Sequence, residues 1–155
     1  MKKLISVEYE VYQIEDLSGV DQDLIKAARE SCESAYAPYS KFQVGASLRL
    51  NSGHIVTGSN QENIAYPSGL CAERVALFYA GANYSNEQIM DLCVVAEGDL
   101  IEKDQHLSPC GGCRQVMCES EKRQGHSIRV LLVNQDGTVS IFKSASDLLP
   151  VTFGK

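Results

Sequence analysis

The chain has 155 residues, of which 44% are hydrophobic and 22% charged, and its formal net charge is −6 at pH 7. This length and composition predict one globular domain with a substantial core, and no apolar run approaches the ~18 residues of a membrane-spanning helix. The negative charge is spread along the chain, which disfavours a nucleic acid polymer as a partner, and no glycine-rich phosphate-binding motif is present. A small, uncharged ligand is therefore favoured.

Strands and helices are expected to alternate along the chain. Apolar residues at every second position of residues 5–11 indicate a short strand or an extended arm. Asp21 is expected to cap a helix that runs to about Tyr36, because Pro38 then ends it. The other expected elements are strands at 42–50 and 54–58, a helix at 71–82 that stops near Gly81, a strand at 91–96, a helix begun by Ser108 and Pro109, strands at 128–133 and 139–142, and a short helix from Ser144. This order predicts a layered α/β domain with a mixed sheet.

The six cysteines occur at positions 32, 71, 93, 110, 113 and 118. The N-terminal stretch MKKLISVEYEVYQ acquires acidic residues too early for a secretory signal, so we expect a cytoplasmic protein. A reducing compartment favours metal binding or catalysis over disulfides. Cys32, Cys93 and Cys118 fall on predicted apolar faces, which leaves three cysteines for chemistry.

The stretch SPCGGCRQVM places Cys110 and Cys113, with two residues between them, at the start of a predicted helix. Alone, this pair is as typical of a redox couple or half of a structural zinc site, taken together, as it is of part of a catalytic zinc site. Cys71 also lies at a helix start, where free N–H groups and the helix dipole favour the thiolate that a metal needs. Three protein ligands with a fourth position left open are typical of catalytic zinc.

Glu73 follows Cys71 by two residues. Alone, a first-turn glutamate is most often a solvated residue that the helix dipole favours. Beside a metal ligand it can instead face the open metal position and act as a general base and acid. The pattern Cys-x-Glu followed by Pro-Cys-x-x-Cys matches the zinc nucleobase deaminases in their three-cysteine form.

Longer segments make the resemblance specific: the chain resembles the small homotetrameric cytidine deaminases. The matching segments are YAPYSKFQVGA, GSNQENIAYPSGLCAER, SPCGGCRQVM and LLPVTF, and they span the chain from about residue 24 to its end. The resemblance implies a three-layer fold with a mixed five-stranded sheet flanked by helices. We expect residues 21–155 to form one deaminase domain, with residues 1–20 as an arm of unknown role. The implied activity is hydrolytic deamination of cytidine and deoxycytidine, with ammonia released, in a homotetramer with shared active sites.

The resemblance also assigns roles by position. One Zn²⁺ per subunit is bound by three cysteines, Glu73 carries protons, and Arg74 donates hydrogen bonds to the zinc thiolates. That role of Arg74 has a physical reason, since three thiolates over-neutralise a dication and a guanidinium restores its electrophilicity. The implied zinc ligands are Cys71, Cys110 and Cys113. The implied substrate contacts are Phe42 on the pyrimidine, Asn60 and Glu62 on the ribose, the Ala72 backbone N–H on the base, and Tyr66 and Phe153 from neighbouring subunits.

The sequence departs from the family pattern at Gln43, where proline is usual, and at Ile64 and Ala65, where small residues are usual. Altered packing is the expected consequence. Competing hypotheses are a deaminase of a cytosine-containing antibiotic such as blasticidin S, a zinc-stapled interaction module without turnover, and a polynucleotide editor. The NQEN segment favours a nucleoside over the antibiotic, and the acidic charge disfavours the polynucleotide.

Overall fold

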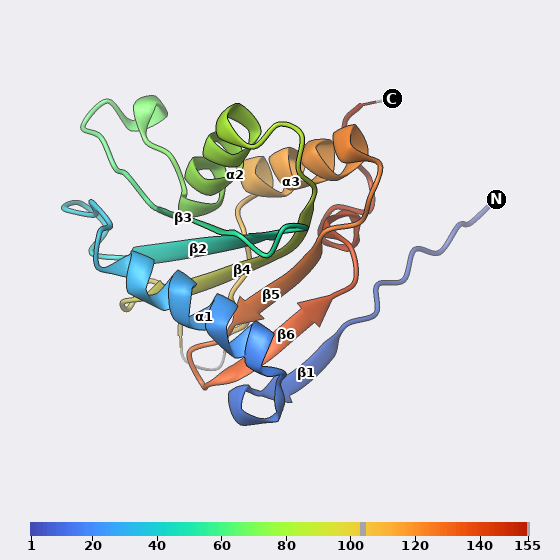
Figure 1. Cartoon of the computed structure of the whole chain (residues 1–155), viewed down its shortest axis with the longest axis horizontal. Helices are drawn as coiled ribbons and strands as arrows, with labels where there is room; N and C mark the ends of the chain where they lie inside the picture. The colour runs from blue at the N-terminus through green and yellow to red at the C-terminus, as the bar shows by residue number, and fades with distance from the viewer. Residues whose placement is uncertain (103–104, 155) are drawn as a thin grey trace.

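The computed structural model describes residues 1–102 and 105–154 (Figure 1). Three α-helices, six strands and three short 3-10 helices are assigned within those residues. The strands are β1 (Glu10–Gln13), β2 (Gln43–Leu50), β3 (Ile55–Ser59), β4 (Ile89–Glu97), β5 (Arg129–Val133) and β6 (Thr138–Phe142). The helices are η1 (Ile14–Asp16), α1 (Gly19–Cys32), η2 (Tyr66–Ser68), α2 (Ala72–Asn83), α3 (Gly111–Gln124) and η3 (Ala145–Leu148).

The strands form one mixed sheet in the order β1-β6-β5-β4-β2-β3. Only the β4–β5 pair is parallel within the described residues, and α3 lies in the connection between these two strands. The mixed α/β class is confirmed, but the expected count of five strands is wrong by one. The sixth strand is β1, in which Glu10 pairs with Ile141 on β6.

Helices cover both faces of the sheet, so the domain has three layers (Figure 1). One core packs α2, α3 and η3 against one face, and a second core packs α1 against the other. Strand β4 contributes residues to both cores, because its alternate side chains point to opposite faces of the sheet. Leu92 and Val94 belong to the first core, whereas Cys93 and Val95 belong to the second. Cys32, Cys93 and Cys118 are buried, as their apolar settings predicted.

Two glycines on neighbouring strands let the helices approach the sheet closely. A Cβ at Gly45 would lie 1.9 Å from the Ala28 carbonyl oxygen of α1. A Cβ at Gly58 would lie 2.7 Å from the Ala76 nitrogen of α2. Because these neighbours are backbone atoms, no side-chain rotation can relieve the contact, and only glycine fits.

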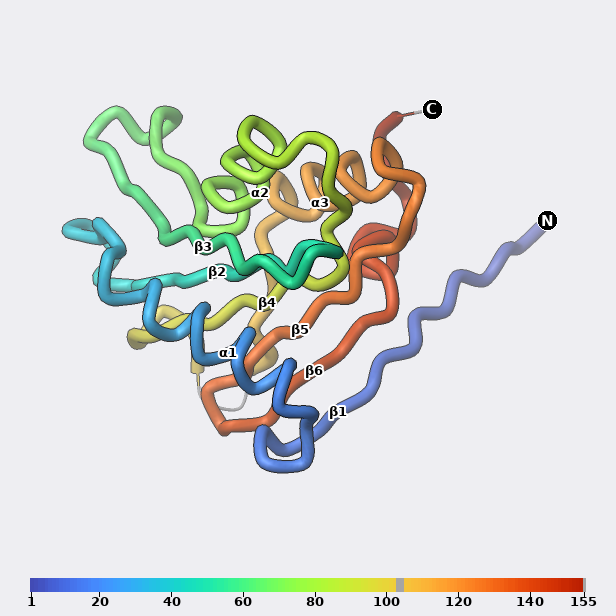
Figure 2. Tube along the Cα trace, in the orientation of Figure 1, coloured from blue at the N-terminus to red at the C-terminus, as the bar shows by residue number. Residues whose placement is uncertain are grey.

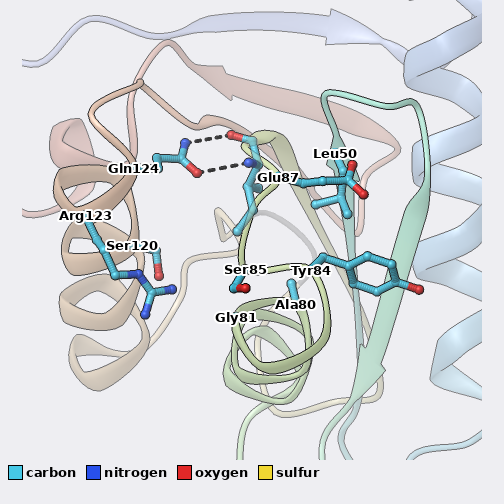
Figure 3. A pocket seen from close by; sticks show the side chains of 10 residues that line it. Leu50, Ala80, Gly81, Tyr84, Ser85, Glu87, Ser120, Arg123 and Gln124 are labelled. Carbon is cyan, nitrogen blue, oxygen red and sulfur yellow. Dashed lines mark hydrogen bonds between the residues drawn. The ribbon is translucent and has the colours of Figure 1, made fainter.

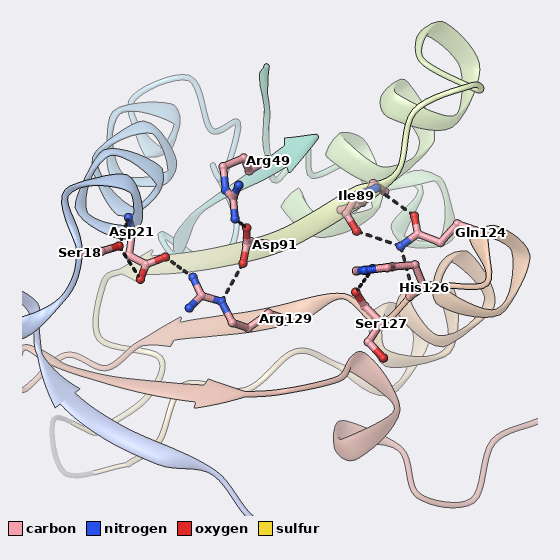
Figure 4. A network of polar contacts seen from close by, with 9 residues as sticks. All are labelled: Ser18, Asp21, Arg49, Ile89, Asp91, Gln124, His126, Ser127 and Arg129. Carbon is pink, nitrogen blue, oxygen red and sulfur yellow. Dashed lines mark hydrogen bonds and ion pairs between the residues drawn. The ribbon is translucent and has the colours of Figure 1, made fainter. Parts of the chain in front are cut away.

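An ion network built around two buried aspartates crosses the sheet (Figure 4). Asp91 on β4 lies directly between Arg49 on β2 and Arg129 on β5, which are its partners in the strand register. Arg129 Nε donates to Asp91 at 2.7 Å, and its Nη2 contacts Asp21 of α1. The network therefore joins three strands and the first helix.

Several predicted helix ends are wrong. Helix α1 is capped by Ser18, whose hydroxyl accepts the Asp21 N–H at 3.2 Å, so Asp21 lies in the first turn instead of at the cap. The helix ends at Cys32, before the predicted Tyr36, and α2 continues past Gly81 to Asn83. Cys110, rather than Ser108, is the N-cap of α3. No helix of the described residues is long and apolar enough to cross a membrane.

Candidate active site

Three sulfur atoms gather where the N-termini of α2 and α3 meet. Cys71 is the N-cap of α2, and Cys110 is the N-cap of α3, with Cys113 in the first turn that follows. The Sγ atoms of Cys71 and Cys110 lie 3.8 Å apart, those of Cys110 and Cys113 lie 3.4 Å apart, and all three lie within 4.8 Å of one another. Zn–S bonds of ~2.3 Å in a tetrahedron would separate the sulfurs by about 3.8 Å. The cluster therefore has the dimensions of a three-thiolate zinc site.

Neither N-cap cysteine uses its sulfur to cap its own helix. A hydrogen bond from Cys113 lowers the pKa of Cys71 to about 5, against the effect of burial, and Arg74 acts in the same direction. The same contact raises the pKa of Cys113. A metal bound among the three sulfurs would hold them as thiolates, because thiolate is the form of cysteine that coordinates a metal. This donor set fits a thiophilic dication.

Glu73 lies beside the sulfur cluster in the first turn of α2 and is only 4% exposed. Burial raises the pKa of Glu73 to about 7, and the negative charge of Cys71 adds to the increase. A carboxyl group with a pKa near neutrality can both accept and donate a proton at the pH of a cell. The structure therefore places a group suited to proton transfer next to the candidate metal ligands.

Arg74, the next residue, directs its guanidinium at the cluster. Its Nη2 lies 3.7 Å from the sulfur of Cys71, and this contact raises the pKa of Arg74. Ala72, on the other side of Glu73, is fully buried at the first position of α2. Its N–H belongs to the first helical turn, where backbone donors have no acceptor inside the helix.

Asn60 at the end of β3 is held by the strand beside it. Its side-chain oxygen accepts the Val44 N–H and its amide donates to the Phe42 carbonyl, both at 2.8 Å. Phe42 is half-buried and packs against the larger core. One amide hydrogen of Asn60 stays available after these bonds, so the side chain can serve a ligand while it fixes the start of β2.

Glu62 lies two residues farther along, and its carboxylate accepts the N–H groups of Tyr39 and Ser40 at 2.9 and 3.3 Å. The Ser40 hydroxyl and these N–H groups lower the pKa of Glu62. The loop returns through a two-way backbone pairing between Gln61 and Leu70, at 2.9 Å in each direction. Because Leu70 precedes Cys71, the structure brings this polar segment to the metal end of α2.

The structure does not fold two of the predicted substrate contacts onto the cluster. Tyr66, in η2, is 90% exposed, and Phe153, near the C-terminus, is 86% exposed. The backbone of Phe153 is nevertheless held, since the Gln115 amide donates to its carbonyl at 3.0 Å and accepts its N–H at 3.3 Å. Helix α3 thus fixes the segment from which the exposed Phe153 ring projects.

Sequence reasoning missed Gln115 and its neighbour Arg114. The Arg114 guanidinium donates to the Pro109 carbonyl at 2.8 Å and to the Leu148 carbonyl at 3.0 Å, and it also reaches the Ser108 hydroxyl. It therefore ties the segment before the Cys110 cap to η3. The signal was present as polar residues directly after Cys113, but their partners are distant in sequence.

None of Cys71, Cys110 and Cys113 lines the cavity drawn in Figure 3. It has a volume of about 220 Å³ and lies between the C-terminal halves of α2 and α3, next to Leu50. Tyr84 and Arg123 are among its lining residues. The Gln124 amide closes one side by pairing with the backbone N–H and carbonyl of Ile89 at 2.9 and 2.8 Å.

Comparison with known proteins gives three kinds of match. The family model of the cytidine and deoxycytidylate deaminase zinc-binding region matches residues 18–125. The cytidine deaminase of Halalkalibacterium halodurans is 39% identical over 132 residues, which cover 85% of this chain and 92% of that protein. The cytidine deaminase of Sporosarcina psychrophila is also 39% identical, over 86% of this chain and 91% of its own length.

Solved structures give the same likeness. A cytidine deaminase from Burkholderia pseudomallei superimposes with a TM-score of 0.73 at 42% identity, and the match covers 85% of this chain and 98% of that one. A cytidine deaminase from Mycobacterium tuberculosis has a TM-score of 0.66 at 30% identity, over 86% of this chain and 97% of that one.

Proposed function

The chain belongs to the family of cytidine and deoxycytidylate deaminases, and on that premise we propose that it hydrolyses cytidine and deoxycytidine to uridine and deoxyuridine. The observation that carries the proposal is that three sulfurs lie together where the N-termini of α2 and α3 meet, with a buried carboxyl group of raised pKa beside them. The three-cysteine cluster and the zinc-binding family region fit one Zn²⁺ per chain.

Cys71, Cys110 and Cys113 would hold the zinc, which when bound supplies a Lewis acid that makes water a nucleophile near neutral pH. Glu73 accepts the proton that water loses and delivers it to N3 of the cytosine ring, which makes C4 electrophilic. The water oxygen then forms its bond to C4. Glu73 takes the remaining proton from that oxygen and delivers it to the exocyclic amino group. The C4–O bond becomes a carbonyl as the C4–N bond breaks, and ammonia leaves. One carboxyl group suffices for both transfers because its pKa of about 7 favours neither state strongly.

In this proposal Arg74 stabilises the thiolates without binding substrate, and its 3.7 Å contact with the Cys71 sulfur supports that role. Phe42 packs against the pyrimidine, and the free N–H of Ala72 meets O2 of the base. Asn60 and Glu62 hold the ribose hydroxyl groups. Hydrogen bonds fix both side chains in the segment that follows β3 and leads to Cys71, and this arrangement supports their proposed role. A site built for hydroxyl groups discriminates against ligands that lack them.

We extend the proposal to a homotetramer in which neighbouring subunits complete each active site. The support is the exposure of Tyr66 and Phe153, whose rings a lone chain leaves in solvent, together with the backbone bonds that hold Phe153 in place. Residues 21–155 would form the deaminase domain. Within the arm of residues 1–20, β1 joins the sheet beside β6 and Ser18 caps α1, so only residues 1–9 extend from the domain. A cytoplasmic location accords with six cysteines that are all free thiols.

The decisive experiment compares the zinc-loaded protein with its Glu73→Gln variant, using cytidine and deoxycytidine as substrates. We expect loss of the cytosine absorbance band and release of ammonia from the unchanged protein. The variant should bind one zinc per chain and turn over neither substrate. A protein that holds zinc but deaminates neither nucleoside would refute the proposed activity, and an unchanged rate in the variant would refute the role of Glu73.

A separate measurement tests assembly. Light scattering of the active protein should give the mass of four chains, and the Phe153→Ala variant should raise KM without loss of zinc. An active monomer would rule out shared active sites while leaving the proposed chemistry intact.

A further inference from the structure

The first nine residues of the chain form an extension that leads out from the folded domain. They belong to no helix or strand, and Figures 1 and 2 show them leading away from the sheet. Leu4 is 93% exposed, and Ile5 and Val7 are exposed as well. The family model begins at residue 18, so this extension lies outside the part of the chain that the family shares.

The base of the extension is fixed to the body. The ring of Tyr9 stacks on Phe142 of β6 with centroids 5.0 Å apart, and the next residue, Glu10, begins β1. Strand β1 lies at one edge of the sheet, so its outer backbone groups have no neighbouring strand among the described residues. An exposed edge continued by an apolar extension is a site for strand pairing with another chain.

The sequence of the extension alternates in the manner of a strand. Odd positions carry Ile5, Val7, Tyr9 and Val11, so one face of an extended backbone is apolar. Charges are separated along its length, with Lys2 and Lys3 at the start and Glu8 and Glu10 toward the body. Such a segment is complementary to itself when two copies run antiparallel, because the basic start of each then lies beside the acidic part of the other.

We infer that residues 1–11 pair with the same residues of a second copy of this chain as a two-stranded antiparallel ribbon. The register places Ser6 opposite Ser6 of the partner subunit on a two-fold axis. Lys2 then lies opposite Glu10 of the partner subunit, and Ile5 lies opposite Val7 of the partner subunit on the apolar face.

The geometry of such a ribbon leaves room for both bodies. The two Glu10 residues are each four positions from the axis, so their Cα atoms lie about 26 Å apart at ~3.3 Å per residue. Each body begins at that distance, on opposite ends of the ribbon. The pairing also covers the outer edge of the residues that precede β1, which would otherwise stay open to aggregation.

Site-directed cross-linking of the full-length, zinc-loaded protein tests the ribbon. Ser6→Cys places two thiols at the axis, and mild oxidation should convert most of the protein into a disulfide-linked dimer on a non-reducing gel. Val11→Cys is the matched control on the same exposed segment. Its two copies lie about 33 Å apart in the proposed register, so it should form at least tenfold less dimer.

Charge reversal tests the register independently. In the Ser6→Cys background, Glu8→Lys with Glu10→Lys should reduce dimer formation about tenfold, because symmetry-related attractions become repulsions. Adding Lys2→Glu to the same chain should restore dimer formation, because residue 2 then again lies opposite a residue 10 of opposite charge. Absence of a Ser6→Cys dimer, equal dimer yields at positions 6 and 11, or a yield that charge reversal leaves unchanged would each overturn the inference.

Discussion

Removal of the Glu121 carboxylate is expected to destabilise the chain by an amount that depends on which acceptor atoms survive. Glu121 is a buried residue of α3. Its Oε2 accepts the backbone N–H groups of Ile128 and Ala145 at 2.8 and 2.9 Å, and its Oε1 accepts the hydroxyls of Ser144 and Ser146 at 2.7 and 2.6 Å. One side chain therefore joins α3 to the start of β5 and to η3.

The two kinds of donor respond differently to substitution. Glutamine can keep its carbonyl oxygen toward the fixed N–H groups, and its amide can face the hydroxyls, which rotate to accept. Glu121→Gln therefore loses mainly the charge-assisted part of the bonds, about 1 kcal/mol. Alanine leaves two buried N–H groups without an acceptor, at ~1–3 kcal/mol each, so Glu121→Ala should lower the free energy of unfolding by about 4 kcal/mol.

Urea unfolding of the zinc-loaded variants at pH 7 and equal protein concentration measures both values. If glutamine proves as destabilising as alanine, or if alanine changes the free energy of unfolding by less than about 1 kcal/mol, Glu121 is not the essential acceptor for the Ile128 and Ala145 N–H groups.

The same carboxylate predicts a pH dependence. Burial acts to raise the pKa of Glu121, but the hydrogen bonds from Ser146, Ile128, Ser144 and Ala145 outweigh it and lower the pKa from its ordinary 4.5. A lowered folded pKa means that the stabilisation is complete above the unfolded pKa and disappears as the pH falls through the folded pKa. The difference between wild type and Glu121→Gln should therefore shrink in unfolding measurements below pH 4.5. A difference that grows on acidification would contradict the sign.

Three further substitutions test other parts of the structure. Gly45→Ala should destabilise the chain by ~3 kcal/mol in urea unfolding, because its Cβ meets α1 backbone, whereas Gly19→Ala, which meets nothing within 4 Å, should not destabilise it. Arg74→Gln should weaken zinc binding roughly tenfold to a hundredfold in chelator competition, since it removes a partner of a ligand sulfur; unchanged affinity would exclude that role. Gln115→Leu should raise KM about tenfold with little change in kcat, because it releases the backbone of Phe153; an unchanged KM would show that the clamp has no role in substrate binding.

The metal cluster was accessible to sequence reasoning because its geometry is mostly local. Cys110 and Cys113 are three positions apart on one helix, and Glu73 follows Cys71 by two, so helix geometry nearly fixes their relative directions. Only the meeting of the two helix starts is long-range, and the longer segments that resemble the deaminases indicated it. The mixed α/β class followed from the order of periodic segments.

The sheet edge and the helix caps needed the tertiary structure. Alternation in residues 5–11 indicated extended backbone. Which of these residues form strand β1 depends on how far β6 extends beside them, and the pairing of Glu10 with Ile141 marks that limit. Asp21 is an adequate cap by residue type, yet Ser18 takes the position, and Asp21 instead contacts Arg129, which lies 108 positions away. Residue type alone does not choose between two candidate caps this close together.

From the sequence alone, the three-cysteine cluster, the adjacent carboxyl group and the class of fold could be predicted, because those depend mainly on short spacings and on hydrophobic period. Tertiary structure decided that Glu73 is buried enough to raise its pKa to about 7, and that Gln115 holds the C-terminal segment. It also decided that Tyr66 and Phe153 point into solvent. The physical reason is that burial and long-range hydrogen bonds are properties of the packed chain, which no local spacing specifies.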